Sequence, residues 1–350
     1  MRDKKRLPLF YKIYFSALAA FAVLLIVGAC SLNAWLANYN KGIPETVSAR
    51  FFTENFENCN AQNILALSGA KPSEFETEDD LRRYVQNMLT GAELSYTAIS
   101  AGSEENVKKY IVKSGEFKVA DFTLKKNADG IWAPASLTLH LPAAANADYR
   151  ILDSSTLYLN GMKVSDAYMT ERVPLENAAC LPEDVPAPEW VTYSVRGLTK
   201  APEALVTDRN GNHPTLTAAE NGCFCEEILY DEPEKELVDR LTAAAKQYAK
   251  CMQNDASKAS VLTYFEKGTD LYNSIRTAEN MFVWDHAGYA FEDESIGEFF
   301  RYDENTVSVR IAFTHILKKA GSADYRDRTD ITYFAHNVDG KYLIFAMHNN

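Results

Sequence analysis

Side chains that could transfer protons gather near the end of the sequence, where Asp285 and His286 are adjacent and Tyr289 follows shortly after. A carboxylate or imidazole base that faces a phenol in an apolar pocket is a recurring arrangement for moving protons. Tyr264 and His315 are further candidates in the same part of the chain. This region is therefore the first place to look for acid–base chemistry.

Neither histidine has a partner that its local spacing specifies. His286 lies in a charged neighbourhood next to Asp285, which is typical of a solvated or hydrogen-bonded surface histidine. His315 alternates with Ile311 and Phe313, which places it on their face of a strand, where a lone histidine is usually a hydrogen-bonded core residue. The sequence therefore predicts no catalytic residue and a protein that is not an enzyme.

Two closely spaced cysteines suggest metal binding at first sight. Cys223 and Cys225 place their sulfur atoms on one face of a predicted strand. A metal site needs further ligands at suitable spacing, and no second pair of cysteines or histidines lies near them; His213 stands alone upstream. The sequence also contains no phosphate-binding glycine loop, nucleophile elbow or paired-histidine zinc motif. We therefore predict neither a metal nor a cofactor.

The sequence has six cysteines, and one of them, Cys30, lies in an apolar N-terminal run. The other five are an odd number and are widely spread, which is not the pattern of a disulfide framework. Most of them are predicted to be small buried side chains. A bond between Cys180 and either Cys223 or Cys225 stays open.

Residues 13–36 carry no charge, and the uncharged run continues to residue 40. A helix of this length spans roughly 36 Å at about 1.5 Å per residue, which is enough to cross a bilayer. Five basic residues and one acidic residue precede the run, and short basic flanks stay cytoplasmic. We therefore predict a signal-anchor, with a cytoplasmic tail over residues 1–12, a transmembrane helix over residues 13–37, and residues 41–350 outside the cell membrane.

A cleaved signal peptide is the alternative, because a basic segment followed by an apolar one suits that too. Val27, Gly28, Ala29 and Cys30 resemble a lipoprotein box, in which Cys30 would be lipidated after cleavage. Apolar residues continue past Cys30, and Trp35 and Tyr39 lie where an interfacial aromatic belt is expected, so an uncleaved span is favoured. In both cases the protein stays tethered to the membrane.

The charge balance limits the partners. The formal net charge is −12, and without the residues that precede the apolar run it becomes −16. An acidic surface repels phosphate backbones, so nucleic acid is excluded as a partner. The same charge argues against broad binding to anionic lipids or anionic wall polymers, although a local basic patch can still exist. The apolar content of 47% is that of folded domains.

The periodicity of the exported part changes twice. Residues 45–142 begin with helical spacing and continue with four alternating segments, whereas residues 143–232 show only short strands with the hairpin signals Asn160-Gly161 and Asn210-Gly211. Helical spacing returns over residues 233–350 and is followed by long alternating segments. We therefore predict an α+β fold class, in which two α+β domains flank a small all-β module.

The closing turns of the two α+β domains carry a resemblance. The last hairpin reads Asp339, Gly340, Lys341, Tyr342 and Leu343, and Asp129-Gly130-Ile131-Trp132 occupies the matching turn of the first domain. Helices followed by a curved meander that closes with such a turn resemble the nuclear-transport-factor-2-like cone, a cystatin-like fold. The whole layout is similar to single-pass envelope proteins of Gram-positive bacteria, including those related to teicoplanin-resistance-associated membrane proteins, although no N-terminal zinc ribbon is present.

This resemblance implies a membrane-anchored, extracytoplasmic binding or scaffold protein whose partner is an envelope protein or a wall component. In a cone domain the concave sheet and its apolar pocket are the default ligand site, and the residues expected near it are Trp284, His286, Tyr289 and Phe313. Some cone-fold proteins resemble ketosteroid isomerases and dehydratases, so a small-molecule binder or an isomerase-like or dehydratase-like enzyme that uses the C-terminal pocket is the alternative. A pure spacer is a third reading. Oligomeric state stays open.

Overall fold

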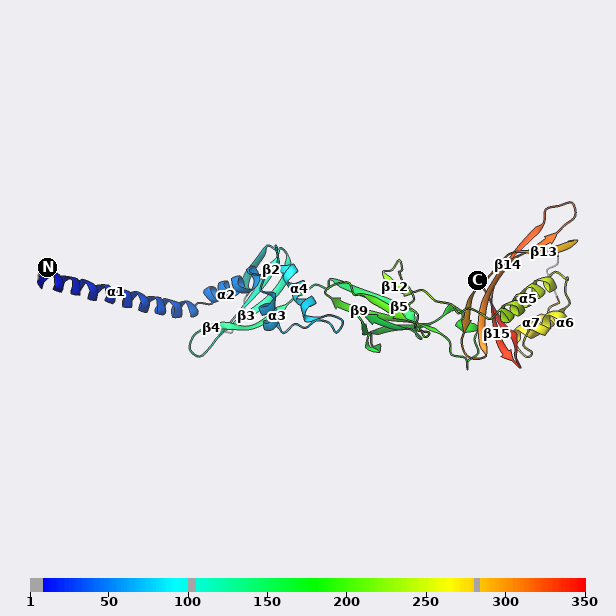
Figure 1. The fold of residues 1–350 in the computed structure, drawn as a ribbon, viewed down its shortest axis with the longest axis horizontal. Helices are drawn as coiled ribbons and strands as arrows, with labels where there is room; N and C mark the ends of the chain where they lie inside the picture. The colour runs from blue at the N-terminus through cyan, green and yellow to red at the C-terminus, as the bar shows by residue number, and fades with distance from the viewer. Residues whose placement is uncertain (1–8, 100–104, 280–283) are drawn as a thin grey trace, which may run out of the picture. The chain divides into compact units, whose positions relative to one another are not determined.

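The computed structural model describes residues 9–99, 105–279 and 284–350, so residues 1–8 of the predicted cytoplasmic tail lie outside it. The chain has a mixed α+β fold with an N-terminal apolar helix and several sheets, which confirms the predicted fold class at that level. It divides into two compact units, one made of Met1–Asn146 with Arg196–Ala201 and the other of Ala147–Val195 with Pro202–Asn350. Each unit is described separately below (Figure 1).

Helix α1 (Leu9–Lys41) is an apolar rod of 33 residues, longer at both ends than the predicted transmembrane segment. Its apolar side chains are exposed along the whole helix, and none of the most apolar window is buried inside the protein. It is the one helix in the described residues that is long and apolar enough to cross a membrane, and its place near the N-terminus also suits a signal sequence. Trp35 stacks on Tyr39 near its end, with ring centroids 5.5 Å apart.

Three further helices of the first unit, α2 to α4, follow α1 along the chain. Helix α2 (Pro44–Phe52) continues into a π-helical turn (Thr53–Glu57) and is followed by α3 (Ala61–Ser68) and α4 (Glu78–Leu89). In the sequence, Thr77 stands three residues before Asp80, which predicts a helix cap close to the capping-box pattern. The structure confirms it at the start of α4: the Thr77 hydroxyl accepts a hydrogen bond from the Asp80 amide, and the Asp80 carboxylate accepts one from the Thr77 amide. Such a reciprocal box satisfies two amides that a helix start otherwise leaves open.

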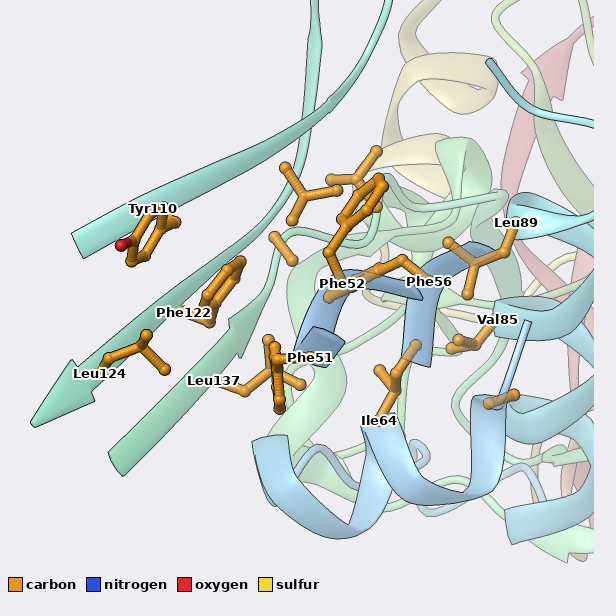
Figure 2. Packing of buried hydrophobic residues seen from close by; sticks show 14 of the residues in the cluster. Phe51, Phe52, Phe56, Ile64, Val85, Leu89, Tyr110, Phe122, Leu124 and Leu137 are labelled. Carbon is orange, nitrogen blue, oxygen red and sulfur yellow. The ribbon is translucent and has the colours of Figure 1, made fainter. Parts of the chain in front are cut away.

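The sheet of the first unit is an antiparallel meander in the order β1 (Leu94–Ile99), β2 (Val107–Ser114), β3 (Phe117–Lys126) and β4 (Trp132–Leu139). The helices cover one of its faces, as Figure 2 shows: phenylalanines of the helices meet aromatic and aliphatic side chains of the strands. Phe51 and Phe122 have ring centroids 4.8 Å apart, and Tyr110 stacks on Phe122 at 4.8 Å. Burial of these rings is the main source of this domain's stability.

A short piece of the predicted β module belongs to the first unit. Within Arg196–Ala201, the amide and hydroxyl of Thr199 donate hydrogen bonds of 2.7 and 2.6 Å to one carboxylate oxygen of Glu76. The ammonium of Lys200 lies 2.9 Å from the Asp80 carboxylate, and this bond lowers the pKa of Asp80 well below its usual range. Two charge-assisted contacts therefore attach this segment to the start of α4.

Two small sheets make up the β part of the second unit, and β5 and β9 also reach into the first unit. The five-stranded sheet has the order β11-β12-β5-β9-β8 and the three-stranded sheet the order β10-β6-β7. The described residues contain no long helix between residues 143 and 232, as predicted. The strands are β5 (Ala145–Leu152), β6 (Thr156–Leu159), β7 (Met162–Lys163), β8 (Met169–Pro174), β9 (Glu189–Leu198), β10 (Ala204–Thr207), β11 (Leu216–Ala218) and β12 (Cys223–Glu226).

The C-terminal part of the second unit repeats the order of helices followed by a meander. Helices α5 (Lys235–Met252), α6 (Lys258–Val261) and α7 (Asp270–Thr277) precede an antiparallel sheet in the order β13-β14-β15-β16. Leu237, Leu241, Ala244 and Ala245 of α5 are buried, as their predicted spacing requires. The strands are β13 (Gly288–Arg301), β14 (Thr306–Lys318), β15 (Tyr325–Val338) and β16 (Lys341–Asn349).

One prediction in this sheet is wrong. The sequence indicated two strands, over residues 283–291 and 296–302, but the chain forms the single long strand β13. Irregularities in its pairing with β14 lie between Glu292 and Ser295 and between Gly297 and Phe300, and Asp293 and Glu298 have positive φ of 54° and 49°. Bulges of this kind admit extra residues without ending a strand. The sequence also predicts a helix over residues 270–282; α7 matches its beginning but ends at Thr277, and residues 280–283 lie outside the described part of the chain.

Candidate functional site

The four residues expected near a ligand pocket occupy two different environments. Phe313 lies in the buried core beneath the helices of the C-terminal domain. Trp284 is 40% exposed and stacks on Tyr325, with ring centroids 4.4 Å apart and an angle of 16° between the planes. Tyr289, near the beginning of β13, is 39% exposed like Trp284, and His286, two residues before β13, is half-buried.

Strands β13 and β14 bring four rings together in a group that we term the aromatic cluster: Tyr289, Phe291, Phe313 and His315. Phe291 stacks on His315 at 4.7 Å with an angle of 12°, and it meets Phe313 edge-on at 5.2 Å. Tyr289 meets His315 edge-on at 5.9 Å. The cause is the register, because Phe291 is paired with His315 and alternate residues of each strand share one face.

His315 is the polar member of the aromatic cluster and is only 1% exposed. Its Nε2 atom is buried and has no hydrogen-bond partner among the described residues. Burial lowers the pKa of His315, and the nearby positive charges of His286 and Lys250 lower it further, against the opposite effect of Asp255 and Asp327. His315 is therefore a neutral imidazole at pH 7, buried as predicted but with one nitrogen left unsatisfied.

Two lysines of α5 lie over the rings of the aromatic cluster. The ammonium of Lys250 is 5.0 Å from the centre of the Tyr289 ring and 6.0 Å from that of Phe291. Lys246 lies 5.5 Å from the Phe291 ring centre and forms an ion pair of 2.6 Å with Glu294. Cation–π contacts at these distances stabilise the charge over the ring face. The surface above the buried imidazole is therefore positively charged.

The second histidine is held by acceptors at both ring nitrogens. Nε2 of His286 is 2.9 Å from the Asp255 carboxylate, and Nδ1 is 2.5 Å from the carbonyl oxygen of Trp284. The bond to the Trp284 carbonyl, followed by the bond to Asp255, raises the pKa of His286. Because a carbonyl oxygen can only accept, Nδ1 donates to Trp284, and Nε2 faces a carboxylate, so both ring nitrogens already have protein partners. His286 therefore joins the end of α5 to the start of β13 and is poorly suited to be a base.

The cavities described in the structure lie away from the aromatic cluster. One of about 450 Å³ is lined by Arg240, Tyr264 and the β15–β16 turn, and one of about 340 Å³ lies between α3 and α4. Tyr264, a candidate from the sequence, faces the first of these, where the Arg240 guanidinium lies 5.3 Å from its ring centre. Charged side chains line both cavities, but neither cavity contains a histidine or a residue of the aromatic cluster.

The cysteine pair does not form a metal site in the described residues, where no group of three or more metal-ligating side chains occurs. All six cysteines lie in the described part of the chain, and each is free. Burial and the neighbouring Cys225 raise the pKa of Cys223 to about 11, so its thiol stays protonated at neutral pH. Cys30 is exposed on α1, and nothing in the fold tests its lipidation.

Phe291, Lys246 and Lys250 belong to this site and were missed from the sequence. The alternation of Tyr289 with Phe291 is the signal that could have found Phe291. The lysines carry no such signal, because an α5 residue meets β13 only after the helix packs on the sheet.

Comparisons with known proteins find little. No protein-family model and no curated protein sequence matches the chain. Among solved structures the chain is similar to an NTF2-like protein involved in plasmid conjugation, with 11% sequence identity and a TM-score of 0.25 over 85% of this chain and 96% of that one. A similarity this weak carries no argument about function. The likeness to teicoplanin-resistance-associated proteins stays a resemblance of sequence pattern.

Proposed function

We propose that this chain is a membrane-anchored binding or scaffold protein of the cell envelope, with its N-terminus in the cytoplasm and residues 41–350 outside. The observation that carries the proposal is α1, whose apolar side chains are exposed along all 33 residues. Moving one large apolar side chain out of water stabilises by about 1.5–3 kcal/mol, and an entire helix of them requires an apolar solvent. The stacked Trp35 and Tyr39 lie near its end, where the headgroup region is expected.

Both α+β domains are proposed to be nuclear-transport-factor-2-like cones. The order of elements supports this assignment: in both domains, helices precede an antiparallel sheet of four strands that pair in the order of the chain. The closing turns also agree, since Gly130 and Gly340 adopt left-handed φ of 78° and 79°. Asp339 before the second glycine is also left-handed, at 51°, which is the geometry of a two-residue hairpin turn. Such domains present a concave sheet to a partner.

A binding role rather than catalysis is favoured by the state of the two histidines. Both ring nitrogens of His286 lie at hydrogen-bond distance from protein acceptors, and His315 is buried among aromatic rings. The observation that favours a small-molecule binder or an isomerase-like enzyme instead is the unsatisfied Nε2 of His315, because an orphaned buried nitrogen is what a ligand hydroxyl would bond. Titration with planar phenols distinguishes the scaffold role from the small-molecule role, with the ring signals of His315 in NMR spectra as the readout. Specific shifts of these signals favour the small-molecule role.

The anchor is tested by membrane extraction and intact mass. The full chain should stay in the membrane pellet after alkaline carbonate, be released by detergent, and retain the mass of the uncleaved sequence. Cys30→Ala should leave all three results unchanged. Loss of the first 29 residues together with an added lipid mass would replace the spanning helix by a lipoprotein anchor, and release by carbonate would contradict membrane anchoring altogether.

The binding role is tested by crosslinking the full anchored chain in envelopes and recovering its neighbours. A reproducible envelope partner that is lost when the exposed surface of the C-terminal domain is changed, for example by Trp284→Ala, supports recognition. Unchanged recovery after deletion of residues 234–350 would instead indicate a spacer.

A further inference from the structure

One end of the first α+β domain lies next to the end of α1. Gly42 is the first residue after the helix. A Cβ atom added to it would meet the carbonyl oxygen of Tyr39 at 3.2 Å and, from the turn between β3 and β4, the carbonyl oxygen of Gly130 at 3.9 Å, which is van der Waals distance. The turn between β3 and β4 therefore touches the point at which the chain leaves α1. If α1 spans a bilayer, this end of the sheet lies at the membrane surface.

Four lysines gather at this end of the sheet, and we refer to them as the lysine end. Lys108 and Lys109 begin β2, and Lys125 and Lys126 end the neighbouring strand β3. The register keeps them together, because Val107 is paired with Lys125 and the Lys126 amide donates a bond of 3.0 Å to the Asn106 carbonyl. All four are exposed, and no ion pair involves any of them in the described part of the chain.

The local charge has the opposite sign to that of the protein. Residues 105–109 and 125–131 carry the four lysines against Glu105 and Asp129, a formal charge of +2, and Glu45 at the start of α2 reduces it to +1. The whole chain carries −12. The local charge of the lysine end is therefore opposite in sign to the net charge of the chain.

Apolar side chains accompany the lysines. Ile131 is exposed in the β3–β4 turn, and Ile99, paired with Lys109, is exposed at the end of β1. Isoleucine and lysine side by side are what an interfacial surface needs, since the apolar group enters the headgroup boundary while the ammonium meets phosphate.

We propose that the lysine end binds the anionic phospholipid headgroups of the bilayer that holds α1. The inference rests on the proposed anchor, because only a spanning α1 brings the sheet to the lipid. Charge complementarity selects anionic lipid: lysines within a Debye length of about 8 Å of the surface are attracted to it, whereas the acidic remainder of the chain is repelled. The tether keeps the patch at the surface, so weak contacts suffice.

Lysine footprinting of the full chain in nanodiscs tests the proposal. The chain is placed in discs of phosphatidylcholine alone or with about 30 mol % phosphatidylglycerol, and acetylation of each lysine is followed by peptide mass spectrometry. We expect Lys108, Lys109, Lys125 and Lys126 to react roughly threefold more slowly in the anionic discs, and to recover at about 0.5 M NaCl. Lys71, exposed in the same unit but away from these strand ends, serves as the matched control and should react equally in both.

The outcomes separate this proposal from the anchor itself. Equal reaction rates in the two kinds of disc overturn the lipid contact while leaving the anchor intact. A chain that does not co-elute with discs of either composition overturns both. Protection by soluble poly(glycerol phosphate) in phosphatidylcholine discs, without protection by phosphatidylglycerol, overturns the lipid contact in favour of a wall polymer.

Discussion

The two α+β domains share one order of elements but treat buried polar groups differently. In the first domain the buried Asn55 donates to the Phe51 carbonyl at 2.8 Å and accepts from Asn63 at 2.5 Å. The buried atoms of the first domain that lack a partner among the described residues are single carboxylate oxygens of Glu76 and Asp121, and the other oxygen of each is hydrogen-bonded. In the C-terminal domain they include Nε2 of His315 and the hydroxyl of Tyr333. A buried unsatisfied group costs about 1–3 kcal/mol, so it marks a place where packing has not been optimised for stability alone. The C-terminal domain therefore carries buried neutral polar groups whose hydrogen-bonding capacity is unused.

The strands differ as well. Those of the first domain have 6 to 10 residues, whereas β13 and β15 have 14 each. The long, bulged strand β13 contributes Tyr289 and Phe291 to the aromatic cluster, over which the two lysines of α5 lie. The same topology thus has short strands in the first domain and long strands in the C-terminal domain.

The largest expected effect is in the core of the first domain. Phe56→Ala removes a ring that is fully buried against the helices and strands, and it should lower the free energy of unfolding of that domain by about 3–5 kcal/mol. The loss of stability is measured by unfolding the full chain with denaturant in detergent, with hydrogen exchange of the β2 and β3 amides as the readout. Phe117→Ala is the control, since that ring is 81% exposed and its loss should change stability by less than about 0.5 kcal/mol. Equal losses of stability in Phe56→Ala and Phe117→Ala would contradict the packing described for the first domain.

A pair of hydroxyl deletions tests the difference in polar groups directly. Tyr333→Phe removes an unsatisfied hydroxyl and should leave the C-terminal domain as stable or stabilise it by up to about 1 kcal/mol. Tyr110→Phe removes a hydroxyl bonded to Ser48 and should destabilise the first domain by about 0.5–1.5 kcal/mol. Both are measured as shifts of the urea midpoint. If Tyr333→Phe lowers the urea midpoint more than Tyr110→Phe does, the proposed difference between the buried polar groups of the two domains is wrong.

Helix capping should behave alike in the two domains. Thr77 and Thr269 each accept a hydrogen bond from an amide at the start of their helix, α4 and α7. Replacing either by alanine should cost about 1 kcal/mol in the domain that contains it, as judged by thermal unfolding. Serine at the same positions is the conservative control and should retain most of the stability. A much larger loss at Thr77 would show that the capping box also secures Lys200 through Asp80.

The smallest effect is a pH dependence confined to the C-terminal domain. The raised pKa of His286 contributes stability below about pH 6.5, which is lost as pH rises through the folded pKa. The lowered pKa of His315 acts in the opposite sense, so its contribution is lost as pH falls below about 6.5. His286→Gln should remove the first slope and His315→Gln the second in unfolding measured from pH 5 to pH 8. Unchanged slopes in both variants would exclude these histidines as the titrating groups.

Local signals in the sequence predicted the elements that depend on local physics. The charge-free run predicted α1, the Thr77–Asp80 spacing predicted the cap of α4, and the return of helical spacing after residue 233 predicted the buried face of α5. Each depends on residues within one or two turns, so a single sequence suffices to show them.

Features that depend on distant pairing could not be predicted. The acidic stretch around Asp293 interrupts the alternation of β13, and only the continuous partner β14 shows that the interruption is a bulge. His286 meets Asp255, which lies 31 residues earlier in the chain, and no spacing rule connects the two. The resemblance to a cone domain placed Trp284 and Phe313 near one pocket, but Trp284 is an exposed ring stacked on Tyr325 and Phe313 is a core ring.

Protease accessibility in intact cells tests the anchored topology most directly. Proteinase K added from outside to cells that express the full chain with a C-terminal epitope should remove the epitope while a fragment containing α1 stays in the membrane. Detergent should be needed before that fragment is digested. An epitope that survives external protease and disappears only after lysis would contradict an extracytoplasmic location of the two domains.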